Sequence, residues 1–128
     1  MRLVVGSLAL LVAVGSVAAE ITGPSDACSG LTAALVPLGY EQLTVSTTVV
    51  SLTKSQYDKP AGVAVAAFAQ VAEQAIRVRD DGALVDATNG LPFAVDDTFW
   101  ICGPSIGRFQ AIRAAAPVAL LNVLYYRQ

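Results

Sequence analysis

Short runs of β-branched, aliphatic and aromatic residues, spaced at about ten positions, fill the chain from Gln42 to its end. These runs are residues 42–52, 62–72, 75–79, 98–102, 108–114 and 118–128. Turn-forming residues lie between most of them, and no intervening stretch has the pattern of a crossover helix, which argues against a parallel α/β sheet. We therefore predict an all-β fold for residues 42–128, a compact antiparallel β-sandwich of the jelly-roll or immunoglobulin-like kind.

The runs differ in how clearly they indicate a strand. In residues 75–82 aliphatic and arginine side chains alternate, and an Asp-Gly pair supplies a turn. Residues 62–72, GVAVAAFAQVA, are ambiguous, because alanine favours a helix whereas valine at alternate positions favours a strand. We predict a strand there, since the flanking runs are strands and the loop lengths suit an antiparallel sheet. Residues 53–62 are predicted to form a loop.

An apolar run opens the chain. Arg2 precedes the uncharged residues 3–19, which end in small side chains, as in a secretory signal peptide. The run is at the short limit for a membrane-spanning helix, and Gly6 and Gly15 interrupt it. We expect residues 1–41 to be an apolar N-terminal arm and connector, with the arm buried between subunits. A signal peptide or a membrane anchor is the alternative interpretation.

The composition is poor in charge. Hydrophobic residues make up 55% of the chain and charged residues only 14%, so we expect surfaces that self-associate or dock on a larger assembly. The eight lysines and arginines form no cluster, which argues against a nucleic-acid partner. The chain contains no histidine, and this excludes histidine-containing catalytic triads and histidine-ligated metal sites.

Two cysteines, Cys28 and Cys102, are separated by most of the domain. Two thiols are too few for a four-cysteine zinc site. Either they pair in an oxidising compartment, or they are two small buried apolar side chains. The sequence leaves both interpretations open.

Five of the ten acidic residues fall between Asp80 and Asp97. Their spacing does not match a calcium-binding loop, and aspartate is common in turns, so we favour a turn role over a metal site. A glycosidase would need sugar-stacking aromatic residues, whereas the one tryptophan, Trp100, lies within an apolar run. Lys54 and Ser55 lie in a polar loop where nothing desolvates the lysine and makes it a base. We therefore predict no catalytic residue, no cofactor and no metal.

Four residues are candidates for an interface with other subunits. Arg77 and Arg79 project from the polar face of their strand and could bind a carboxylate or phosphate ligand. We favour pairing with acidic residues of a neighbouring subunit. Tyr125 and Tyr126 are adjacent, so one faces the core and the other faces outward as an interface anchor.

Three segments together carry a resemblance: LTVSTTVVSLT (43–53), AIRVRDDGALVDATNGLPF (75–93) and IGRFQAIRAAAPVALLNVLYYRQ (106–128). They are similar to a group of small virion proteins of tailed bacteriophages. Members have a Thr/Val-rich strand, an Ile-Arg-x-Arg-x-Asp-Gly hairpin, a Phe-x-x-Ile-Arg strand and a final Asn-Val-x-Tyr-Tyr strand. The chain departs from the pattern after the Asp-Gly turn, where members commonly have Pro-Thr and this chain has Leu-Val-Asp. The resemblance covers residues 42–126 and implies a β-sandwich that binds other virion proteins as a multimer.

The function that this resemblance implies is structural and non-enzymatic. We expect a capsid decoration, head-fibre or tail accessory protein that binds the major capsid or tail protein as a homo-oligomer, such as a trimer. It would assemble in the host cytoplasm, have no membrane or nucleic-acid partner, and keep an intact N-terminus with free or dispensable thiols. The alternative is an exported bacterial β-sandwich binding module, periplasmic or secreted. It would be a monomer that begins near Glu20 after signal cleavage, with a Cys28–Cys102 disulfide on which its stability depends.

Overall fold

The computed structural model describes Cys28 and residues 34–128, and the apolar run at the N-terminus lies outside these residues. Nearly all of the regular structure is β-strand. The elements in chain order are β3 (Val36–Val45), β4 (Val50–Ser51), α3 (Lys54–Tyr57), β5 (Asp58–Lys59), β6 (Gly62–Val63), β7 (Ala66–Ala72), β8 (Ile76–Arg79), β9 (Leu91–Phe93), β10 (Thr98–Cys102), α4 (Ser105–Arg108), β11 (Gln110–Arg113) and β12 (Ala119–Arg127). The all-β prediction is therefore confirmed.

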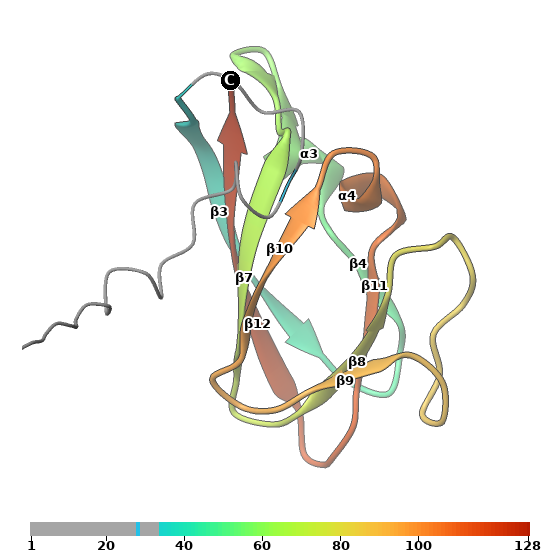
Figure 1. Ribbon diagram of the computed structural model, residues 1–128. Helices are drawn as coiled ribbons and strands as arrows, with labels where there is room; N and C mark the ends of the chain where they lie inside the picture. The colour runs from blue at the N-terminus through green and yellow to red at the C-terminus, as the bar shows by residue number, and fades with distance from the viewer. Residues whose placement is uncertain (1–27, 29–33) are drawn as a thin grey trace, which may run out of the picture.

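Two four-stranded sheets make up the fold, with strand orders β10-β7-β12-β3 and β4-β11-β8-β9, and β5 and β6 form a small separate hairpin. All of these strand pairs are antiparallel. Figure 1 shows the long strands β3, β12 and β7 side by side, with β11, β8 and β9 on the other side of the molecule. The last strand, β12, lies in the middle of the first sheet and pairs with both β3 and β7. The first sheet therefore requires both ends of the described chain.

One hydrophobic core lies between the two sheets. Along β12, Leu121, Val123 and Tyr125 are fully buried while the residues between them are not. In the second sheet, Ile76 and Val78 of β8 enter the same core. This alternation is the pattern predicted for β8, because successive side chains of a strand point to opposite faces.

The single strand predicted over residues 42–52 is wrong in its bounds. The extended segment begins earlier, at Val36, and ends at Val45, and β4 belongs to the other sheet. In the break, the backbone N–H of Thr48 donates to the hydroxyl of Ser46. The β-branched residues favour extended backbone over the whole of residues 42–52. The segment is nevertheless divided, because β3 pairs with β12 in the first sheet whereas β4 pairs with β11 in the second.

Three other predicted segments differ in detail. The loop predicted over residues 53–62 contains the helical turn α3 and the β5-β6 hairpin. The Gly-Pro-Ser-Ile-Gly turn before residue 108 forms the short helix α4, with Ile106 buried. The strand predicted over residues 62–72 is confirmed as β7, although it begins at Ala66. Alanine is therefore extended here, because the backbone of β7 pairs with β10 on one side and with β12 on the other, and tertiary pairing overrides the helix propensity of alanine.

Candidate functional site

A cavity of about 500 Å³ opens between the two sheets where their edge strands β10 and β9 lie. Phe93 of β9 stacks on Phe99 of β10, with ring centroids 4.3 Å apart and an interplanar angle of 20°. The ring of Phe109 lies 6.1 Å from that of Phe99. Further apolar residues of the lining include Val78, Leu91 and Ile101. Trp100 and the charged residues Arg79, Asp80 and Asp81 also line it. A cavity of this size with a mainly apolar lining is typical of a binding site.

The connection between β9 and β10 places the stacked phenylalanines. The backbone N–H of Ala94 donates to the carboxylate of Asp97 at 2.7 Å, and Asp96 has a φ of 74°, which aspartate tolerates better than most residues. The backbone N–H of Asp96 also donates to the carbonyl of Val71 in β7. The turn that follows β9 of the second sheet is therefore hydrogen-bonded to β7 of the first sheet.

Large aliphatic side chains are exposed on β9 and in the two connections that flank it. Leu91, which lines it, is 66% exposed. Leu84 in the β8–β9 connection is 67% exposed, and Val95 in the β9–β10 connection is 44% exposed. Exposed apolar side chains of this size are typical of interaction surfaces. We call these three residues the apolar rim.

The two arginines predicted as interface residues have partners within the chain. Arg79 forms a bidentate ion pair with Asp81, with Nε–Oδ1 and Nη2–Oδ2 distances of 3.0 and 2.5 Å. The hydrogen bond from Arg79 lowers the pKa of Asp81 to about 2, and the same bond raises the pKa of Arg79. Arg77 donates to the carbonyl of Gly90 at 3.1 Å. Both side chains thus brace the β8–β9 connection, and their pairing with a neighbouring subunit stays a prediction.

The acidic residues of this region act in turns. One oxygen of Asp86 accepts hydrogen bonds from the backbone N–H and hydroxyl of Thr88 and from the backbone N–H of Asn89. These bonds lower the pKa of Asp86. Gly90 follows with a φ of +114°, and a β-carbon there would lie 2.8 Å from a methyl group of the buried Val85. In the described part of the chain, no three cysteine or acidic side chains gather in a way that could hold a metal ion.

The structure places the two tyrosines on opposite faces of β12. Tyr125 is fully buried, so as an interface candidate it is wrong: it is a core residue whose hydroxyl donates to the carboxylate of Glu41. Burial and this hydrogen bond raise the pKa of Tyr125. Tyr126 is half-buried on the outward face, and its ring lies 5.8 Å from that of Trp100. Adjacent residues of a strand point to opposite faces, which accounts for this difference. The pairing of β12 with β3 shifts register between the same two residues.

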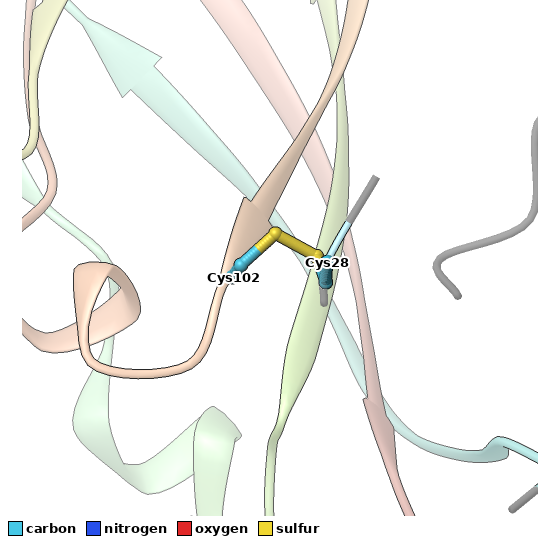
Figure 2. Close-up of a disulfide and its surroundings, with 2 residues drawn as sticks. All are labelled: Cys28 and Cys102. Carbon is cyan, nitrogen blue, oxygen red and sulfur yellow. A yellow bond between two sulfur atoms is a disulfide. The ribbon is translucent and has the colours of Figure 1, made fainter. Parts of the chain in front are cut away.

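A disulfide joins Cys28 to Cys102, with Cα atoms 5.3 Å apart and a sequence separation of 74. Figure 2 shows Cys102 at the end of β10 and Cys28 beside it. Cys28 is 3% exposed. The bond fixes Cys28 to the edge strand of the first sheet. It is the pairing that the export interpretation requires and that the phage interpretation does not.

The sequence reasoning missed both the cavity and the outward face of the first sheet. Phe99 lies in a predicted strand, but no strand was predicted over Leu91–Phe93, and the contact between Phe93 and Phe99 depends on β9 and β10 being the edges of different sheets. Lys54 and Ser55 are exposed in α3, and neither lines the cavity.

Comparison with protein-family models, curated proteins and solved structures finds no match to this chain. Across the residues that the structure describes, no helix has the length and apolar character needed to cross a membrane. Function must therefore be argued from the surface chemistry of the domain.

Proposed function

We propose that this chain is a non-enzymatic structural protein of a tailed-phage virion that associates with copies of itself and with a larger virion protein. The observation that carries the proposal is the mainly apolar cavity with its stacked phenylalanines, together with the exposed aliphatic side chains of the apolar rim. Such a surface would exclude water by receiving an aromatic or aliphatic side chain of a partner. The segments that resemble phage virion proteins supply Leu84, Leu91 and Phe93 of this surface, whereas Val95 and Phe99 lie between two of those segments.

Leu91→Asp tests the association. A carboxylate at this position would have to be desolvated against the partner, so we expect it to weaken self-association at least about tenfold. Val63→Asp is the matched control, because Val63 is 57% exposed on the separate β5-β6 hairpin. Analytical ultracentrifugation over a range of concentrations measures both. A wild-type chain that stays monomeric throughout, or equal effects of the two variants, would contradict the proposed surface.

Location in a virion needs its own measurement. We expect immunoblotting to detect the chain in phage particles banded on a density gradient from an induced culture of the source strain. Its absence from particles that contain the major capsid and tail proteins would refute the virion assignment.

The disulfide favours a second candidate function, an exported β-sandwich binding module. Structural disulfides persist in oxidising compartments, including the periplasm and the extracellular medium. Intact-mass spectrometry of the protein from its natural source, with and without reductant, separates the candidates. A full-length chain supports the virion protein, whereas a chain that begins at Glu20 and gains two protons on reduction supports export.

A further inference from the structure

The outward face of the sheet β10-β7-β12-β3 carries a row of polar side chains that crosses all of its strands. The strand register places Asn122 beside Gln42 on one side and beside Gln70 on the other, and it places Thr98 beside Gln70. These four residues, which we call the amide row, face away from the core because the residues that alternate with them enter it. Segments from four distant parts of the sequence therefore contribute one continuous polar line.

Hydrogen bonds fix the direction of the amides. The side-chain oxygen of Asn122 accepts from the Tyr40 hydroxyl at 3.0 Å and from the Gln42 amide at 2.9 Å, and its nitrogen donates to Gln70 at 3.4 Å. Three side-chain polar groups of the row take no part in these hydrogen bonds: Gln42 Oε1, Gln70 Nε2 and the Thr98 hydroxyl. None of these groups bonds to any residue that the structure describes. The row thus presents both a donor and an acceptor to solvent.

A second row, which we call the aromatic row, lies beside the first. Tyr40, Leu124, Phe68 and Trp100 follow one another across the same strands. Tyr40 is 53% exposed, and the Phe68 ring lies 4.8 Å from that of Trp100. Successive outward residues of a strand are about 7 Å apart, so a single sugar-sized ring against the aromatic row would reach the amide row with its substituents.

The face is hollowed between the rows and carries no charge. A hollow of about 330 Å³ is lined by Tyr40, Phe68, Gln70, Thr98, Asn122 and Leu124. Among the described strands of this sheet, the residues that face outward between the strand ends include no lysine, arginine, aspartate or glutamate. A phosphate, sulfate or carboxylate ligand would therefore find no countercharge. The chemistry that fits is a neutral ring with one apolar face and hydroxyl or amide groups at its edge.

We propose that this face binds a neutral polysaccharide. A sugar ring packs against Tyr40 and Phe68, and its hydroxyl or acetamido groups form hydrogen bonds with the amide row. The site goes beyond the proposed structural function and does not depend on it. Trp100 of the aromatic row also lines the cavity between β9 and β10, but no residue of the amide row does, so the amide-row variants report on this site alone.

Tryptophan fluorescence provides a direct test, because Trp100 is the only tryptophan and belongs to the aromatic row. The full chain is titrated with the hexasaccharides of N-acetylglucosamine, of β-1,4-linked glucose and of α-1,4-linked glucose, and with polygalacturonate as an anionic probe. We expect saturable emission changes with at least one neutral sugar and none with polygalacturonate. Gln70→Ala and Gln42→Ala should each weaken that binding about tenfold, since each removes one hydrogen-bonding group.

Gln56→Ala in α3 is the matched control and should leave binding unchanged, because Gln56 lies off this face. Gln42 and Gln70 are exposed, so their variants should keep the wild-type thermal unfolding midpoint. The proposal is overturned if no neutral sugar changes the emission at about 10 mM, where a Kd of about 1 mM would give near saturation. Binding of polygalacturonate alone, or unchanged binding in both variants, would also overturn it. Leu91→Asp should bind sugar as the wild type does. A failure of the sugar-binding proposal can therefore be distinguished from a failure of the self-association proposal.

Discussion

At the scale of single residues, Glu41 is the polar group that joins separate parts of the fold. It lies in β3, and its carboxylate accepts hydrogen bonds from the Tyr125 hydroxyl in β12 and from the backbone N–H and hydroxyl of Thr53. These bonds connect the middle strand of the first sheet to the start of α3. Because hydrogen bonds to charged groups are stronger than neutral ones, this small network should contribute measurably to stability.

Tyr125→Phe tests this network. The change keeps the ring but leaves the partly buried carboxylate of Glu41 without one donor, so we expect the free energy of unfolding to fall by about 1.5–3 kcal/mol. Urea denaturation measures the loss. Tyr57→Phe is the control: the Tyr57 ring lies 6.1 Å from that of Tyr125, but its hydroxyl bonds to none of the described residues. Equal loss in the two variants would show that the Glu41 bond contributes nothing.

At the scale of elements, the connection between β8 and β9 is held by its own polar side chains. The Arg79–Asp81 pair closes its start, the hydrogen bonds of Asp86 shape its middle, and Arg77 anchors its end at Gly90. The exposed Leu84 lies within this connection. A loop with this internal bracing can present an apolar side chain to a partner at little further entropic cost.

Asp81 makes this connection sensitive to acid. Its folded-state pKa of about 2 lies below its ordinary value, so the ionised carboxylate stabilises the fold above about pH 4. This contribution is lost as the pH falls through about 2. We expect the thermal unfolding midpoint of the wild type to drop more steeply between pH 4 and pH 2 than that of Asp81→Asn.

The effect of Asp81 should be small and should weaken with added salt, because the pair is exposed. Asp58→Asn, at an exposed aspartate outside this connection, is the control and should follow the wild type. Parallel curves for wild type and Asp81→Asn would show that the ion pair does not stabilise the folded state.

At the scale of the whole molecule, the disulfide is the one covalent link between distant segments that the structure describes. It closes a loop of 74 positions between Cys28 and the edge strand β10. Restricting the unfolded chain by a loop of this length is worth up to about 4 kcal/mol. For a small domain of marginal stability, this is a large part of the total.

Reduction of the disulfide should therefore lower the guanidinium midpoint of unfolding. The Cys28→Ser, Cys102→Ser double variant should match the reduced wild type and should not respond to reductant. Coincident unfolding curves for oxidised and reduced protein would show that the thiols are dispensable, as the phage interpretation expects.

The sequence by itself determined the class of the fold. Alternation in residues 75–79 identified β8 and its buried face, and the turn residues identified most of the strand ends, because side-chain period and backbone preference are local properties. The same reasoning failed for residues 42–52, where one β-favouring run serves two sheets. It also could not tell which of two adjacent tyrosines would be buried.

Only the tertiary structure decided which strands are neighbours, and every candidate site depends on that. Phe93 meets Phe99 because β9 and β10 are edges of different sheets, and Gln42 meets Asn122 and Gln70 because β12 inserts between β3 and β7. Pairing of this kind joins residues far apart in sequence, so no local pattern contains it. Local sequence patterns therefore determine where the strands form, whereas the order of the strands in the two sheets determines which residues meet in each candidate site.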